Sequence, residues 1–142
     1  MDKYLGIDYG AVRIGIAVSD DTKTIAFGRE FIGNNNTSLK YIRSLVESEN
    51  ISKIIIGYPV SLKGEKTRQT LEVEQFEAGL KKAFMNIEII RWDERFTSKI
   101  AQESMIESGM KKKKRQQKGN IDIISAALLL QSYLDSVKQV SI

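Results

Sequence analysis

Cysteine and histidine are both absent from this 142-residue sequence. Without cysteine there is no disulfide, no thiolate metal site and no cysteine nucleophile. Without histidine there is no Ser-His-Asp triad, no histidine zinc site and no imidazole base. If the protein is an enzyme, its chemistry must use carboxylates, lysines, hydroxyls, backbone amides or a bound metal. Hard cations with oxygen ligands fit this set of residues best.

Proline is scarce, with a single residue, and long apolar runs are missing. The longest apolar stretches, residues 53–59 and 123–130, are far shorter than the roughly 20 residues that a membrane-spanning helix needs. The first residues lack the apolar core of a signal peptide. We therefore expect one domain over residues 1–142, no membrane partner and a cytoplasmic location.

The basic charge of the chain is concentrated in one place. The sequence has 22 Lys and Arg against 18 Asp and Glu, for a net charge of +4. Residues 111–118 (KKKKRQQK) hold six of these cations and no acid, which leaves 16 basic against 18 acidic residues elsewhere. Such a run is either a solvated loop or a surface that contacts nucleic-acid phosphates. Its members are Lys111, Lys112, Lys113, Lys114, Arg115 and Lys118.

The first third of the chain has the alternating apolar pattern of strands. Residues 3–9 and 12–18 predict two strands around a Gly-Ala turn, and residues 25–32 a third. Since the connections between them are short, we expect an antiparallel meander.

The remaining pattern alternates between helix and strand. We expect a helix after residue 36, a buried strand over residues 53–57, a helix over 65–84 and a strand over 87–92. A third helix over about 97–107 and a last one over 121–137 follow. The inner faces of the first two helices should carry Leu39, Ile42, Leu45 and Val46, and Leu71, Phe76, Leu80 and Phe84. This order predicts an α/β fold with a mixed five-stranded sheet, three antiparallel strands and then two parallel, flanked by helices.

Asp8 is an acid inside an apolar strand, between Ile7 and Tyr9, with Gly6 and Gly10 leaving space nearby. An ionised carboxylate in a central strand is costly unless it is paired or bound to a metal. Asp8 is therefore a candidate metal ligand. The alternative is an aspartate that hydrogen-bonds the Gly10 turn.

Two further acids occupy comparable places. Glu94 directly follows the last strand, where ligands gather in open α/β sheets. Its neighbour Asp93 must face the opposite way in an extended segment, so one of the two is structural, paired with Arg91 or Arg95. Asp122 opens the last, very apolar helix, where it is either a site residue or an acid stabilised by the helix dipole, with Asn120 as the cap.

Taken together, Asp8, Glu94 and Asp122 could converge on one side of the sheet. Converging carboxylates repel one another unless cations intervene. Divalent Mg²⁺ or Mn²⁺ held by these acids would activate a water and stabilise the leaving oxygen in phosphodiester cleavage without histidine. The sequence therefore suggests these acids as both metal ligands and catalytic residues.

The glycine-containing segment over residues 57–64 follows the buried strand. It lacks the Gly-Lys-Ser/Thr of a nucleotide P-loop. It is either a structural loop or, through Lys63, Lys66 and Arg68, a phosphate contact.

Four segments in order resemble the YqgF family, also called RuvX: GIDYGAVRIGIAVSD, IIIGYPVSLKG, DERFTS and KGNIDIISAALLLQSYLD. That family is described as RNase H-like Holliday junction resolvases and pre-16S rRNA nucleases. The resemblance covers residues 3–136 and implies an RNase H-like fold, with Asp8, Glu94 and Asp122 as the acidic cluster. It also implies Arg13, Ser61 and Arg95 as supporting polar residues and a role in maturing the 5′ end of 16S rRNA. Lys63 and Lys66 depart from the more acidic loop expected in many members.

The expected function is thus a metal-dependent endonuclease acting on pre-rRNA, with branched DNA as the alternative substrate. A non-catalytic RNA-binding module and an ATP-binding fragment of the actin-like fold are rivals of other classes. The oligomeric state stays open between monomer and homodimer.

Overall fold

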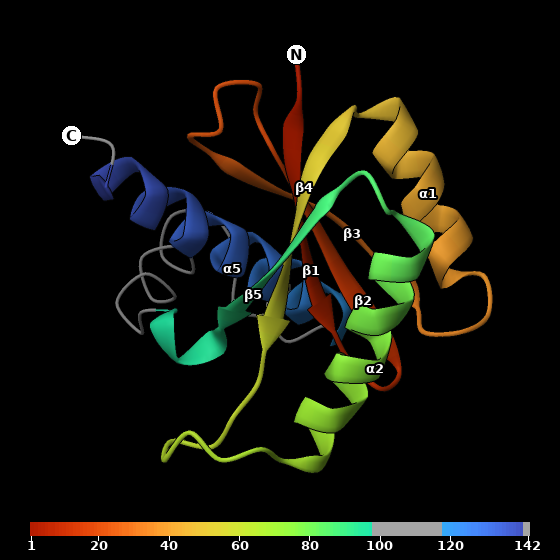
Figure 1. Ribbon diagram of the computed structural model, residues 1–142, viewed down its shortest axis with the longest axis vertical. Coiled ribbons are helices and arrows are strands. Elements are labelled where there is room, and N and C mark those ends of the chain that lie inside the picture. The colour runs from red at the N-terminus through yellow and green to blue at the C-terminus, as the bar shows by residue number, and fades with distance from the viewer. Residues whose placement is uncertain (98–117, 141–142) are drawn as a thin grey trace.

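The computed structural model describes residues 1–97 and 118–140. Three strands come first, and helices and strands alternate after them, as the sequence pattern indicates (Figure 1). The elements are β1 (Lys3–Tyr9), β2 (Arg13–Ser19), β3 (Ala26–Gly33), α1 (Ser38–Ser48), β4 (Ile51–Tyr58), α2 (Arg68–Ala83), β5 (Glu88–Asp93), the short 3₁₀ helix η1 (Glu94–Phe96) and α5 (Lys118–Val140).

The five strands form one mixed sheet in the order β3-β2-β1-β4-β5. Neighbours β1, β2 and β3 run antiparallel, whereas β4 is parallel to both β1 and β5. The predicted meander and the mixed five-stranded sheet are both confirmed. Because β1 is central, its residue Asp8 lies between Gly15 of β2 and the end of β4.

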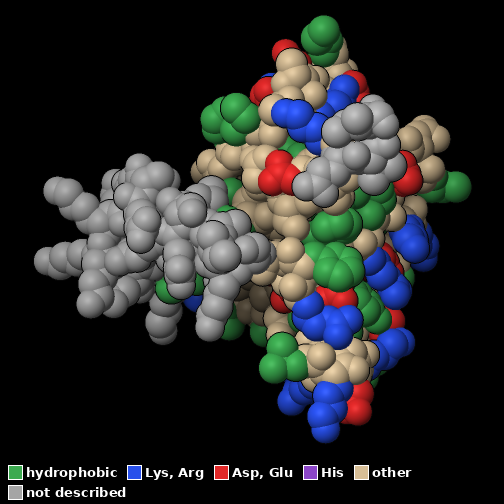
Figure 2. All heavy atoms as spheres, turned by 90° about the vertical axis from the view of Figure 1, so that its left-hand side faces the viewer, with side chains coloured by type: hydrophobic (Ala, Val, Ile, Leu, Met, Phe, Trp, Pro, Cys, Tyr) green, Lys and Arg blue, Asp and Glu red, His purple; other side chains and the backbone are tan. Residues whose placement is uncertain are grey.

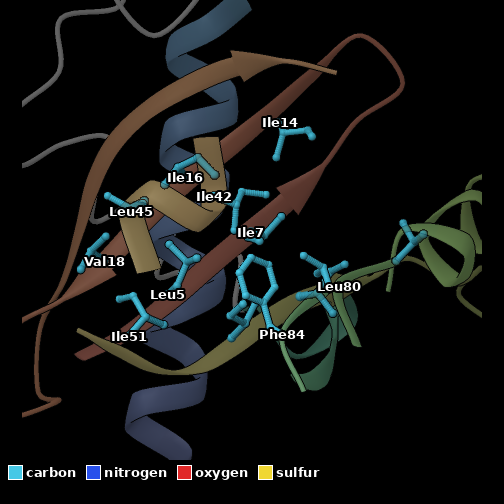
Figure 3. Packing of buried hydrophobic residues seen from close by; sticks show 13 residues of the cluster. Leu5, Ile7, Ile14, Ile16, Val18, Ile42, Leu45, Ile51, Leu80 and Phe84 are labelled. Carbon is cyan, nitrogen blue, oxygen red and sulfur yellow. The ribbon is translucent and has the colours of Figure 1, made fainter. Parts of the chain in front are cut away.

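Helices cover both faces of the sheet. Helices α1 and α2 lie on one face and α5 crosses the other (Figure 1). Alternate residues of each strand face one helical layer or the other. Residues of β1 and β2 such as Leu5, Ile7, Ile14 and Ile16 pack with Ile42, Leu45 and Leu80 on the α1 and α2 side (Figure 3). On the other side Ala17 and Ile55 pack with Ala126, Leu130 and Leu134 of α5.

Two glycines let α5 approach the sheet closely. A Cβ on Gly15 would lie 2.0 Å from the backbone oxygen of Asp122, and one on Gly6 would lie 2.8 Å from the Cβ of Leu130. Any side chain at Gly15 would therefore push α5 away. The missing side chain fixes the start of α5 directly above the β1 and β2 pair.

Some predicted boundaries and faces of the helices are wrong. Helix α2 begins at Arg68 rather than at residue 65, because Thr67 and Thr70 form a reciprocal capping box there. Leu71 and Leu39, predicted on inner faces, are exposed. The last helix begins at Lys118, so Asn120 lies inside it and is not its cap. The predicted helix over 97–107 lies outside the described residues.

No helix within the described ranges is long and apolar enough to span a membrane.

Candidate active site

Asp8 is the polar residue near the carboxyl end of the central strand β1. Its neighbour Ile7 belongs to the core under α1 and α2, so the side chain of Asp8 faces the α5 side of the sheet. Directly opposite in β2 is Gly15, which has no side chain to fill the space. The strand thus holds one carboxylate in a partly buried position beneath α5.

Glu94 comes from the turn of η1 that follows β5. Its side chain lies over the end of β4, where its Oε1 is 2.7 Å from the position that a Cβ on Gly57 would take. The adjacent Asp93 instead accepts hydrogen bonds from the backbone and guanidinium of Arg95, the shortest at 2.6 Å. Glu94 is therefore the inward acid, and Asp93 pairs with one of its two predicted partners.

Asp8 and Glu94 share a pocket of about 160 Å³. Its lining residues are Asp8, Glu94, Thr97, Ser125, Leu128 and Leu129. The two carboxyl groups are hydrogen-bonded to each other, which requires a proton between them. Two leucines and two hydroxyls surround the pair.

The two acids of the pocket have raised pKa values. Burial, then the charge of Glu94 and its hydrogen bond, and then the charge of Asp122 raise the pKa of Asp8 to about 8. Burial is also the main cause that raises the pKa of Glu94, with the charge of Asp93 adding to it, while the hydrogen bond from Asp8 opposes the rise. By contrast the guanidinium of Arg95 lowers the pKa of Asp93. The pocket therefore brings two acids together, and the described residues that line it include no basic group.

Asp122 lies in the second turn of α5, close enough for its charge to act on Asp8. Its carboxylate accepts a hydrogen bond of 2.8 Å from Nε of Arg13 at the start of β2. The charge of this third acid is thus already balanced. The structure brings all three predicted acids to the same side of the sheet, but only two of them line the pocket.

The donor set of the pocket fits a hard divalent cation. In the described ranges, no three acidic side chains are arranged as ligands of one metal ion. Mg²⁺, however, is commonly held by one or two carboxylates, with waters and substrate phosphates completing its shell. Asp8 and Glu94 supply such a pair, and a bound cation would offset the burial and the mutual repulsion that raise the pKa of Asp8. Asp122 could bind the same cation only after its hydrogen bond with Arg13 breaks.

The predicted nucleic-acid contacts lie in different places. Lys63 is exposed, Ser61 accepts a hydrogen bond from the backbone of Glu65, and Arg95 also donates to the backbone oxygen of Leu62. Basic side chains are dispersed among acidic ones on the face shown in Figure 2. Lys111, Lys112, Lys113, Lys114 and Arg115 lie outside the described residues, as does the side chain of Lys118.

Lys66 and Arg68 are the other two cations that the sequence suggests as phosphate contacts. Lys66 donates to Glu74 at 2.9 Å, and Arg68 lies 3.5 Å from Glu72 in an exposed pair. Both cations thus have acidic partners within the protein.

Two polar residues of the pocket escaped prediction. Ser125 follows Asp122 by three positions, so the helical period places both on one face of α5. That spacing could have identified it. Thr97 directly follows η1, and no pattern in the sequence distinguishes it from a capping residue.

Proteins of known sequence agree closely with this chain over nearly its full length. The family model described as "RuvX: Holliday junction resolvase" matches residues 2–136. A protein of Flavobacterium psychrophilum named "Putative pre-16S rRNA nuclease" is 43% identical over 134 residues, covering 94% of this chain and 97% of its own length. A protein of the same name from Amoebophilus asiaticus is 37% identical over 139 residues, covering 98% of each.

Solved structures share the fold at low sequence identity. RuvC of Thermus thermophilus, in complex with a Holliday junction substrate, has a TM-score of 0.60 at 12% identity, over 96% of each chain. The yeast mitochondrial Holliday junction resolvase Ydc2 has a TM-score of 0.57 at 12% identity, over 99% of this chain and 80% of its own. The sheet order and helices thus define an RNase H-like fold of the resolvase type. Within this class, the chain belongs to the RuvX family, also called YqgF.

Proposed function

We propose that this chain is a metal-dependent endonuclease that processes the 5′ end of pre-16S rRNA, with Asp8, Glu94 and Asp122 at its catalytic centre. The observation that supports the centre best is the pair of carboxyl groups, Asp8 and Glu94, that share one pocket under α5. The names of the relatives support the substrate. We place this activity in one cytoplasmic domain that acts on nucleic acid.

Asp8 and Glu94 would hold Mg²⁺ or Mn²⁺ between β1 and η1. A bound cation supplies activation of a water and stabilisation of the leaving oxygen of the phosphodiester. The carboxylates bind through oxygen only after the proton between them is released, so the raised pKa of Asp8 opposes binding below about pH 8. Leu128 and Leu129 exclude water from one side of the pocket.

Arg13 would fix Asp122 at the edge of the centre. Its bond to Asp122 joins the start of β2 to α5 and directs the carboxylate across the end of the sheet. Asp122 thereby sets the electrostatic environment of Asp8 from the α5 side. Lys63, Ser61 and Arg95 lie along or beside the loop after β4, where an incoming phosphate backbone would run.

A cleavage assay on a labelled 5′ fragment of pre-16S rRNA tests the proposal. Purified protein should cut it with Mn²⁺ or Mg²⁺ and not in EDTA, and Asp8→Asn should abolish cutting while leaving the circular-dichroism spectrum unchanged. Asp20→Asn, which changes a half-buried turn aspartate just beyond the far end of β2, should cut normally. Full activity of Asp8→Asn would refute the assignment of the centre. Binding without cleavage would favour a non-catalytic RNA-binding module instead.

A second candidate function is the resolution of four-way DNA junctions. The description of the matching family model favours it. Equal amounts of junction DNA and of the rRNA fragment, offered in one reaction with distinct labels, separate the two. Faster cutting of the junction would make branched DNA the substrate and leave the same catalytic acids in place.

The basic run over residues 111–118 would hold the nucleic-acid backbone without base selectivity, since lysine contacts to phosphate carry no sequence information. Replacing its cations by serine should weaken binding and flatten the dependence of affinity on salt. Unchanged affinity throughout a salt titration would exclude the run from the interface.

A further inference from the structure

Strand β3 is an edge of the sheet with an exposed surface of mixed character. It pairs with β2, and no other strand of the described ranges pairs with it. Between the buried residue at its start and its end, nearly every position is exposed, including Phe27 at 54% and Phe31 at 43%. An edge strand with free backbone groups and exposed aromatic side chains is a ready template for another strand.

The hydrogen bonds at both ends of β3 determine which backbone groups are free. The amide of Asn34 donates to Val12, and the amide of Asp20 donates to the carbonyl of Ile25, so Asn34 and Ile25 face β2. Since antiparallel residues alternate, the groups of Ala26, Gly28, Phe31 and Gly33 point away from β2. The amide of Ala26 already donates to Gln131 and the carbonyl of Gly33 already accepts from Ser38, so the open groups are those of Gly28 and Phe31. A β-bulge at the shift between Ile16 and Ala17 accounts for the odd spacing between Gly28 and Phe31.

We infer that β3 is a docking edge for a second copy of this chain, paired antiparallel with its own β3. In one register Gly28 of one copy lies opposite Phe31 of the other. This register pairs the open backbone groups of Gly28 and Phe31 on both sides of the axis. Ala26 then lies opposite Gly33, but the Ala26 amide and the Gly33 carbonyl keep their partners Gln131 and Ser38. The two sheets become one continuous sheet around a two-fold axis.

The same register makes the charges complementary. Arg29 of each copy faces Glu30 of the other, so one Arg–Glu ion pair lies on each side of the two-fold axis. Moving the register by one residue in either direction would place Arg29 against Arg29 or Glu30 against Glu30. Edges that resist pairing usually carry charges that repel their own copy, often lysine. Here the neighbouring charges of opposite sign select a single alignment instead.

The side chains also match by face. Phe31 is opposite Gly15 and Gly28 is opposite Ala17, and both of these β2 residues face α5. On this face Ile123 of the same copy already covers Gly28, so the ring of Phe31 would lie beside Ile123 of the other copy. On the other face Phe27 would meet Ile32, since their β2 partners Val18 and Ile14 lie in the α1 and α2 core.

Sedimentation velocity of the full-length protein across a concentration series tests the inference. The wild type should show a reversible monomer–dimer equilibrium. Glu30→Lys should weaken the dimer by roughly tenfold or more, because both cross-strand pairs become repulsive. Glu65→Lys, the same charge change in the loop after β4, should leave the dissociation constant unchanged. A wild type that stays monomeric, or a dimer indifferent to Glu30→Lys, would overturn the inference.

A mixing experiment tests the register itself. Arg29→Glu should also fail to form a homodimer, since its pairs become acid against acid. An equimolar mixture of Arg29→Glu with Glu30→Lys, however, restores opposite charges at both pairs and should dimerise like the wild type. Arg29 also pairs with Glu49 at 2.9 Å, so melting curves of each variant must first show that it is folded. If the folded variants fail to associate in the mixture, this register is wrong.

Discussion

Asp8→Asn should make the metal-free protein more stable at neutral pH while removing its proposed activity. The pKa of Asp8 is raised to about 8 in the folded protein, from an ordinary value of 3.8 in the unfolded chain. The folded state therefore retains a proton that the unfolded state has lost between these values. Stability is full below about pH 4 and is lost as the pH rises toward 8.

The size of this effect follows from the pKa difference. Each pH unit between the two pKa values lowers the free energy of unfolding by about 1.4 kcal/mol. Asn at position 8 cannot ionise, so the free energy of unfolding of the variant does not fall with pH in this way. At pH 7 the free energy of unfolding of Asp8→Asn should be higher than that of the wild type by up to roughly 4 kcal/mol. Near pH 4 the two values should be about equal.

Urea denaturation at several pH values in EDTA measures this difference. The fluorescence of Trp92, the single tryptophan, reports unfolding because its ring packs on Tyr133 and Phe96. Asp20→Asn is the matched control. Hydrogen bonds from Thr22 and from backbone amides lower the pKa of Asp20 to about 2. The ionised Asp20 stabilises the folded protein above about pH 4, and this contribution is lost as the pH falls toward 2. Asp20→Asn should therefore be less stable than the wild type at neutral pH.

A difference in the free energy of unfolding between Asp8→Asn and the wild type that stays constant from pH 4 to pH 8 would refute the reasoning. So would a variant that is less stable than the wild type at pH 7. Either result would mean that Asp8 is not held against its own ionisation in the folded protein.

Three further outcomes are expected. Mg²⁺ or Mn²⁺ at a concentration 100 times the dissociation constant should raise the free energy of unfolding of the wild type at pH 8 by about 2.7 kcal/mol, but not that of Asp8→Asn. Gly57→Ala should slow cleavage tenfold or more with little change in melting temperature, because its Cβ would lie 2.7 Å from Oε1 of Glu94 and displace that carboxylate. Arg91→Leu should lower the free energy of unfolding in urea by about 2 kcal/mol or more, since it leaves the buried carboxylate of Glu77 without the guanidinium that binds it.

Much of the fold could be predicted because it depends on local pattern. Alternation of apolar residues is enough to place β1 and β2, and the uniformly apolar run of β4 shows that both of its faces are covered. The helix boundaries were harder to predict from the sequence. Thr67 starts α2 through a capping box whose partner is Thr70, in place of the usual Glu or Gln, so the familiar signature is absent.

The site was predictable in its residues and less so in its geometry. Asp8, Glu94 and Asp122 each stand where a strand ends or a helix starts, which predicts that they meet. The ion pair between Arg13 and Asp122 joins residues more than a hundred positions apart, so it depends on how closely α5 packs over Gly15. No local pattern encodes such a distance.

The proposed centre takes one acid from the first strand, one from the turn after the fifth and one from the closing helix. A ribosome making this chain releases Asp8 well before α5. Until α5 emerges, the pocket has no Ser125, Leu128 or Leu129 to enclose it, and Arg13 has no Asp122 to bind. A nascent chain therefore carries no assembled cutting centre beside the ribosomal RNA on which it is being made.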